Sequence, residues 1–377
     1  MLALSGCASA PAEKVAAFQD GPVCHYEAVE FSGDFEGGRL SACRQEGDRR
    51  FALYFRPEDT PINPSSWYAF AIEQASPREL ELSLNYVHGW HRYVPKVSLD
   101  DGETWAELEA TPSREGKRAT IRPPAAAGRV LIAGQPLFNL DRYRSWMDEL
   151  ESHPGVERQT IGASEAGREI EAISFGADGA PVLVLIGRQH PPEIPGAIAM
   201  QAFVNRLLED DPLAVRFRQA FRVELIPVLN PDGVALGHWR HNTRGVDVNR
   251  DWGPFTQAES RAARDWMAQL GDLAVAIDFH GTRIDTLYTQ PDDVPGERAG
   301  FPRDLSEALI RHLGARAPKR DAAHNPDLPT SKTWIHTTYS IPALTYEVGD
   351  ATPLPEIDET ARVAAEVTMH LLLEEPA

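Results

Sequence analysis

Two kinds of hydrophobic pattern divide the chain near residue 138. Between about residues 21 and 135, short runs of alternating apolar and polar residues are separated by turn residues, and no long helical pattern lies between them. Strands at such spacing predict a small all-β sandwich domain. After residue 138, apolar strands alternate with helix-like segments. This alternation predicts an α/β domain with a mixed, mostly parallel sheet flanked by helices.

One strand of the second domain, at 181–186, is apolar throughout, which is typical of a strand covered on both faces. We divide the chain into a leader and linker at 1–20, the sandwich at 21–137 and the α/β domain at 138–377. The expected strands of the sandwich are 51–55, 67–72, 80–84, 96–99 and 129–132. Those of the second domain are 181–186, 221–228, 273–279 and 343–348. The expected helices of the second domain are 140–150, 196–208, 257–270, 303–313 and 357–373.

Composition and charge exclude several classes of protein. The 377 residues are 42% hydrophobic and 25% charged, which is ordinary for a globular protein and excludes fibrous and disordered classes. With 56 acidic against 37 basic residues, the formal net charge is −19. Nucleic acid and anionic membrane surfaces are therefore poor partners. The chain also lacks the run of roughly 18 apolar residues that a transmembrane helix needs.

The first residues contain Leu4-Ser5-Gly6-Cys7, which resembles the lipobox of bacterial lipoprotein signal peptides. The basic start and apolar stretch of a full signal are missing, so we expect a truncated lipoprotein leader, explained by a start codon placed too late. The alternative is an Ala/Ser-rich frayed terminus. A true lipobox implies a lipid anchor at Cys7 and a periplasmic or outer-membrane protein; otherwise we expect a cytoplasmic one.

Two further cysteines lie in alternating segments joined by a Gly-rich turn. If those segments form a hairpin, Cys24 and Cys43 come within bonding range. A Cys24–Cys43 disulfide fits an oxidising compartment, and the alternative is two free thiols.

Polar clusters follow the apolar strands of the second domain, where ligands of such sheets gather. His190 and Glu193 follow the 181–186 strand, with two prolines between them that restrict the loop. Alone, this pair favours a loop histidine beside a solvated glutamate. His280, after the 273–279 strand, is by itself more typical of a hydrogen-bonded core histidine. Together the three match the ligand arrangement of catalytic zinc sites that leave a fourth position to water.

An arginine-rich segment at 239–252 follows the next strand of this acidic protein. A guanidinium binds a carboxylate through two parallel hydrogen bonds, and an adjacent amide adds a donor. Arg250 with Asn249 therefore predicts a carboxylate anchor rather than a solvated charge run. Glu347, in the 343–348 strand, is costly to bury without a partner or a task. Acting as general base beside a metal-bound water is such a task.

These clusters together resemble the zinc carboxypeptidases, or funnelins, from about residue 140 to 375. The family's His-x-x-Glu loop, Asn-Pro-Asp-Gly turn, Asn-Arg pair, strand-terminal His and late Glu occur here in order. The resemblance implies one zinc ion per chain, bound by His190, Glu193 and His280. It also implies that Asp247 orients a zinc-bound imidazole from behind.

The same resemblance implies the substrate and the reaction. Arg240 is expected to stabilise the oxyanion, while Asn249 and Arg250 hold the terminal carboxylate of a peptide or protein. Glu347 is expected to deprotonate the zinc-bound water and to protonate the leaving amine. The implied function is a zinc metallocarboxypeptidase that hydrolyses the C-terminal peptide bond.

The first domain narrows the resemblance to one branch. The segments 31–40, 67–70 and 90–93 look like the β-sandwich that precedes the catalytic domain in cytosolic-carboxypeptidase-like enzymes. One departure concerns a loop tyrosine of the family, since the corresponding stretch 321–325 has none. Tyr339 or His336 are candidate substitutes.

Lys332 lies at the position that in the family usually faces the side chain of the last substrate residue. A buried ammonium there would attract an acidic side chain, whereas a lysine that reaches solvent would not. Two other functions stay open: an amidase or carboxypeptidase acting on peptidoglycan peptides, which the leader makes reasonable, and a non-catalytic binding module. The presence of both the metal set and the base argues against the binding module.

Overall fold

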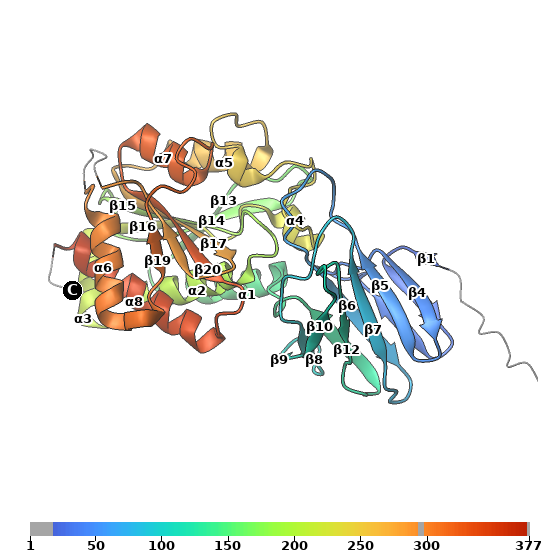
Figure 1. The fold of residues 1–377 in the computed structure, drawn as a ribbon. Coiled ribbons are helices and arrows are strands. Elements are labelled where there is room, and N and C mark those ends of the chain that lie inside the picture. Colours follow the sequence, from blue (N-terminus) through green and yellow to red (C-terminus); the bar gives the residue numbers. More distant parts are fainter. Residues whose placement is uncertain (1–17, 293–297, 375–377) are drawn as a thin grey trace, which may run out of the picture.

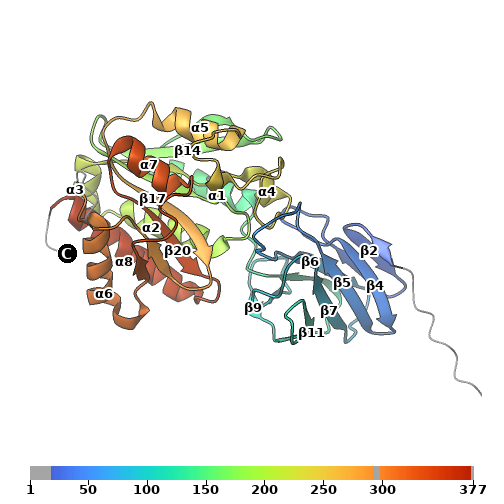
Figure 2. The same ribbon diagram turned by 45° about the horizontal axis from the view of Figure 1, so that its top comes forward.

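The computed structural model describes residues 18–292 and 298–374, and it shows a β-rich domain beside an α/β domain (Figure 1). The resemblance to a lipobox at Leu4–Cys7 falls outside the described residues. In both views α1 and α4 lie on the side of the α/β domain that faces the sandwich (Figure 2). Within the described ranges, no helix is both long and apolar enough to cross a membrane.

The first domain is a sandwich of two six-stranded sheets, with orders β1-β4-β5-β7-β11-β10 and β2-β3-β6-β12-β8-β9. It confirms the predicted β-rich domain, which begins at β1, slightly before the expected residue 21. The strands are β1 (Gln19–Asp20), β2 (Val23–Tyr26), β3 (Val29–Ser32), β4 (Ala42–Gly47), β5 (Arg50–Phe55), β6 (Ala69–Gln74), β7 (Glu81–Tyr86), β8 (Lys96–Ser98), β9 (Ala106–Glu107), β10 (Ala110–Pro112), β11 (Arg118–Ile121) and β12 (Gly128–Ala133).

Cys24 and Cys43 form a disulfide, but the predicted route to it was wrong. The two cysteines do not face each other across a hairpin. Cys24 lies in β2, whose hairpin partner is β3, and Cys43 lies in β4, which pairs with β5 in the other sheet. The bond therefore joins the two sheets, because the buried faces that pack in a sandwich bring inward-pointing residues together.

The second domain is built on one eight-stranded mixed sheet with the order β13-β14-β16-β15-β17-β20-β18-β19. Its central strands β16, β15, β17 and β20 are parallel to one another, as predicted. The strands are β13 (Glu157–Ala163), β14 (Glu169–Gly176), β15 (Val182–Gly187), β16 (Arg222–Ile226), β17 (Leu273–Thr282), β18 (Thr286–Tyr288), β19 (Lys319–Asp321) and β20 (Ala343–Gly349).

Helices cover both faces of this sheet (Figure 1). Leu183 and Leu185 of β15 belong to the core formed with α2 and α8, while Val184 and Ile186 belong to the core on the face of α5 and α7. This explains the apolar run of β15. The helices are α1 (Leu140–Glu151), α2 (Ile194–Leu207), α3 (Pro212–Ala220), α4 (Pro231–Ala235), α5 (Ala258–Met267), α6 (Phe301–Leu313), α7 (Ser331–Tyr339) and α8 (Leu354–Leu372), with short 3-10 turns at Val248–Arg250 and Gly314–Arg316.

Several elements were not predicted. They include β9, β10 and β11 of the sandwich and, in the second domain, the edge hairpin of β13 and β14, the short strands β18 and β19, and the helices α3, α4 and α7. The side chains of β13 are exposed or half-buried along the whole strand, so its sequence shows no clear hydrophobic period. Helix α7 has few buried residues. Such elements form because the sheet edge and its covering layer offer them partners, not because of their own pattern.

Candidate active site

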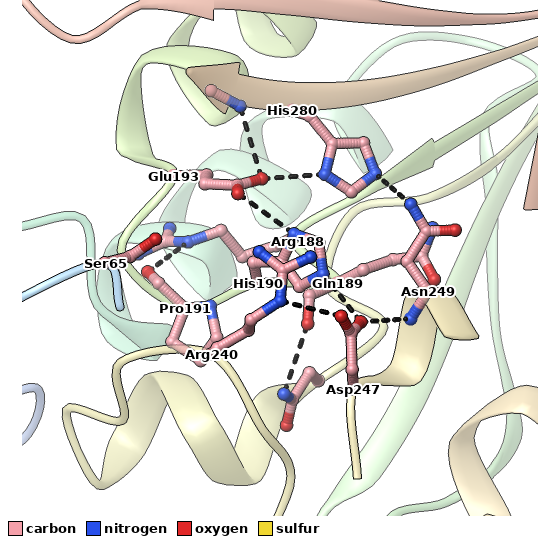
Figure 3. A network of polar contacts seen from close by, with 12 residues as sticks. Ser65, Arg188, Gln189, His190, Pro191, Glu193, Arg240, Asp247, Asn249 and His280 are labelled. Carbon is pink, nitrogen blue, oxygen red and sulfur yellow. Dashed lines mark hydrogen bonds and ion pairs between the residues drawn. The ribbon is translucent and has the colours of Figure 1, made fainter. Parts of the chain in front are cut away.

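The polar clusters of the second domain meet at the carboxyl ends of β15, β17 and β20. His190 and Glu193 lie in the turn between β15 and α2, while His280 and Glu347 are in β17 and β20. Arg188 shapes the turn, since its Nε donates to Pro191 O at 2.8 Å (Figure 3). Its Nη1 donates to Phe138 O at 3.0 Å. A glycine is required at position 196, in the first turn of α2, because a Cβ there would lie 2.4 Å from the carbonyl oxygen of His280.

The carboxylate of Glu193 lies between the two imidazoles (Figure 3). Its Oε1 is 2.9 Å from His190 Nδ1 and its Oε2 is 2.7 Å from His280 Nδ1. One ligand atom from each of the three residues lies within 4.8 Å of the others, and all three residues are buried. Two imidazole nitrogens and one carboxylate oxygen converging at such range fit a catalytic zinc site.

A further carboxylate lies behind each imidazole. His190 Nε2 is 2.9 Å from Asp247 Oδ1, and His280 Nε2 is 2.8 Å from Asp278 Oδ2. A carboxylate on Nε2 keeps the proton on that nitrogen and leaves the Nδ1 lone pair for a metal. Asp247, predicted to orient an imidazole, thus contacts His190, and the corresponding contact of His280 is made by Asp278, for which no role was predicted. The signal was present, because residues two apart in a strand share one face.

Arg240 is buried and held next to this cluster. Its Nε donates to Asp247 Oδ2 at 2.7 Å, so the same carboxylate orients both an imidazole and a guanidinium. Burial opposes the charge of Asp247, but His190 and Arg240 outweigh it and hold the pKa of that carboxyl well below its usual range. Asp247 is therefore an anion that contacts both Arg240, the predicted oxyanion donor, and His190, a predicted metal ligand.

Glu347 contributes a carboxylate oxygen, Oε2, that is buried and has no hydrogen-bond partner among the described residues. Burial and the charge of Glu193 raise the pKa of Glu347 to about 7, although the two histidines lower it. A carboxyl with a raised pKa and a free oxygen beside a metal set has the properties of a general base.

The site lies in a cleft of about 460 Å³ that both domains line. Arg240, Asn249, Arg250 and Lys332 all reach it. Arg250 Nη1 donates to the Asn249 carbonyl at 2.8 Å. The Asn249 side chain is held through its Oδ1, which accepts from Ser331 N at 2.9 Å, and its Nδ2 lies 3.2 Å from His280 Nε2. Both residues of the predicted carboxylate anchor line the cleft.

Lys332 points into the cleft and not to solvent, since it is buried and its Nζ donates to the carbonyl of His324 at 3.0 Å. Burial lowers the pKa of Lys332, although the carboxylate of Asp321 opposes this. Within the described ranges, no carboxylate forms an ion pair with it. A buried cation held only by carbonyl groups favours an anionic ligand.

The suggested substitutes for the loop tyrosine do not line the cleft. Tyr339 packs on Trp334, with ring centroids 5.6 Å apart, and His336 Nδ1 bonds the carbonyl of Ile341 at 2.8 Å. The suggestion was wrong because α7 turns both side chains away from the site. The tyrosine that lines the cleft is Tyr288 of β18, stacked on His324 at 3.8 Å.

The sandwich lines one wall of the cleft with Asn63, Pro64, Ser65, Trp90 and Arg92. Arg92 donates to Asp350 through Nε at 2.7 Å and Nη2 at 3.1 Å, just after β20. No motif in the sequence of this domain predicts such a contribution to the cleft. Its contribution arises from how the two domains pack.

A mixed α/β sheet that carries a buried His–Glu–His set defines a metal-dependent hydrolase. A model of the zinc carboxypeptidase family matches residues 143–363, and a model of the cytosolic carboxypeptidase N-terminal domain matches residues 31–133. The chain therefore belongs to the zinc carboxypeptidase family, a family of zinc-dependent peptidases. The N-terminal match confirms the branch that the sequence indicated.

Relatives and solved structures agree with this assignment. The chain is 28% identical to a Zymomonas mobilis protein over 67% of each chain. It is 26% identical to human cytosolic carboxypeptidase 6 over 66% of this chain, and thus spans only 56% of the human protein. The structure of a metallo-carboxypeptidase from Burkholderia cenocepacia is 18% identical, with a TM-score of 0.78 over 92% of this chain and 98% of that one. This last likeness concerns the fold.

Proposed function

We propose that the protein is a metallocarboxypeptidase that removes residues from the C-termini of peptides or proteins. The observation that carries this proposal is the free Oε2 of Glu347 beside the His190, Glu193 and His280 set, in a cleft that Arg240 and Arg250 also line. A zinc ion held by that set would act as a Lewis acid and lower the pKa of its water.

The side chains of the chain would perform the remaining tasks. Arg250 binds the terminal carboxylate and so fixes the last peptide bond in the cleft. Arg240 donates to the carbonyl oxygen as it gains negative charge. Glu347 accepts a proton from the attacking water and transfers it to the leaving amine.

An acidic C-terminal residue is the preferred substrate in this proposal. The chain carries a net charge of −19, yet its cleft is lined by the cations Arg92, Arg240, Arg250, Arg283 and Lys332. Local cationic charge in an acidic protein attracts anionic substrates and repels cationic ones. Lys332, buried without an ion-pair partner in the described ranges, is the residue that would recognise the side chain.

A substrate panel tests the proposal. Peptides that end in Glu, Lys or Phe, together with purified muropeptides, are incubated with the zinc-loaded protein before and after chelation. We expect chelator-sensitive release of single C-terminal residues, fastest for Glu. Cleavage of muropeptides alone would replace this proposal by the cell-wall one, and no release from any substrate would overturn the activity itself.

The compartment is a separate proposal. We infer that the protein functions in an oxidising compartment such as the periplasm, and the support is the disulfide between the buried Cys24 and Cys43. Protease added to intact and to permeabilised native cells checks this inference. Digestion only after the cytoplasmic membrane is opened would contradict it.

A further inference from the structure

We propose that Glu58 of the β-sandwich is a positioning residue for catalysis, whose carboxylate holds the main chain around Arg240 and so sets the place of the Arg240 guanidinium. Glu58 lies in the loop after β5, and the segment it contacts lies after α4 in the other domain. This inference rests on the proposed function, in which Arg240 stabilises the oxyanion.

Three successive main-chain N–H groups donate to the Glu58 carboxylate. Trp239 N donates to Oε2 at 2.7 Å, while Arg240 N and His241 N donate to Oε1 at 2.8 Å and 2.6 Å. Consecutive N–H groups that converge in this way form an anion site. The Glu58 carboxylate fills that site from the neighbouring domain, so the conformation of the segment depends on the sandwich.

The carboxylate is ionised in this position. Burial favours its neutral form, but His238 and the main-chain donors outweigh burial and lower the pKa of Glu58. Hydrogen bonds to a charged acceptor are roughly twice as strong as neutral ones. A glutamine could replace it only in part, because its one amide oxygen can accept at a single carboxylate position, while its amide nitrogen would face the N–H donor at the other.

Arg240 is thereby held at both ends. Its main-chain nitrogen is fixed by Glu58, and its Nε is fixed by Asp247 Oδ2 at 2.7 Å. Among the residues with described positions, its Nη groups have no protein partner, and Arg240 lines the cleft. A guanidinium anchored at its main chain and its Nε presents the remaining donors to the cleft in one direction. Such preorganisation is what an oxyanion donor requires.

The sandwich also contacts this segment at a second point. Gly37 N donates to Ala235 O at 2.9 Å. Gly237 has a φ of +59°, and a Cβ there would lie 2.4 Å from the Gly38 carbonyl oxygen. These contacts hold the domains together without touching Arg240. Removal of Glu58 should therefore release the Arg240 main chain while the two domains remain docked.

The test measures steady-state kinetics and bound zinc for Glu58→Ala and Glu58→Gln in the full chain, with a peptide that the wild type cleaves. Misplacement of a catalytic group by about 1 Å can cost on the order of 10²-fold, so we expect kcat to fall at least about tenfold. KM should change less than about threefold, because Arg250 still binds the carboxylate. Zinc content should stay at the wild-type level.

Chemical rescue separates positioning from general destabilisation. Formate or acetate can occupy the space left in Glu58→Ala and accept the three N–H groups, so either anion should restore part of kcat in that variant and leave the wild type unchanged. A merely structural role predicts no such rescue. Rescue that is absent, or a kcat equal to that of the wild type, would overturn the inference.

Asp59→Ala is the matched control. Asp59 belongs to the same loop and accepts from His241 Nδ1 at 2.7 Å, but it does not touch the Arg240 main chain. We expect a kcat close to that of the wild type. Equal losses in the Asp59 and Glu58 variants would show that loosening of the domain contact is responsible, and would also overturn the inference. An inactive wild type would instead overturn the proposed function.

Discussion

His280 and Glu347 are register partners in the adjacent parallel strands β17 and β20. The pairing puts a predicted zinc ligand and the carboxylate with a free oxygen next to each other at one end of the sheet, although they are distant in the chain. Hydrogen bonding of the strand backbones, rather than the two side chains, determines this spacing. The geometry therefore depends on residues that carry no chemistry.

Asp278 should control metal affinity. Ser331 Oγ and Gln189 Nε2 both donate to Oδ2 of Asp278, the oxygen that contacts His280. In Asp278→Asn an uncharged amide takes the place of the carboxylate that contacts His280. Loss of such a partner typically weakens metal binding about 10- to 100-fold, and we expect a loss of zinc affinity of this size. Competition with a chromogenic chelator measures the zinc Kd. Asp272→Asn, an exposed site just before the same strand, is the control, and equal affinities in both variants would disprove the role.

The activity should fall in acid. Glu347 must be a carboxylate to accept a proton, so kcat/KM is lost as the pH drops through its pKa. Burial and the charge of Glu193 raise that pKa to about 7, and a dication held by the neighbouring ligand set would lower it by favouring the carboxylate. The acid limb of the kcat/KM profile should therefore lie at or below about pH 7. A limb at distinctly higher pH would show that another group controls the rate.

The ion pair between Arg92 and Asp350 should stabilise the domain contact. Both side chains are largely buried, at 12% and 9% exposure. Removing one member of a buried pair costs about 3–5 kcal/mol, because the other charge remains without a partner. We expect urea unfolding to show that Arg92→Met lowers the free energy of unfolding by this amount. The double variant Arg92→Met, Asp350→Leu should recover part of it, and strictly additive losses would argue against coupling.

Lys332 should set the preference for acidic residues. A hydrogen bond to a charged group contributes about 1.5–3 kcal/mol. Lys332→Met should therefore reduce kcat/KM for a peptide ending in Glu by about 10- to 100-fold, while a peptide ending in Phe changes little. Lys319→Met, on an exposed residue of β19, should alter neither. Equal losses for both peptides would mean that Lys332 supports the fold and not the specificity.

Much of the site was predictable because the chemistry is concentrated at the ends of apolar strands. His190, Glu193 and Glu347 follow or end strands that are recognisable from their apolar runs, and ends of neighbouring parallel strands meet. Asp278 was equally within reach, since it shares a strand face with His280. The place of Tyr288 in the cleft could not be predicted, because this residue lies on the short strand β18, which has too few residues to show a period.

The sequence by itself determined the order of the apolar strands and the long helices, the two-domain plan and the identity of the groups that can bind a metal, because hydrophobic period and residue type are local properties. Only the tertiary structure decided which groups from different domains or from different sheets meet. It placed Glu58 on the main chain of Arg240, Arg92 on Asp350, and Cys24 on Cys43 across two sheets. Such contacts depend on how separate surfaces pack, and no periodicity along a single segment encodes that arrangement.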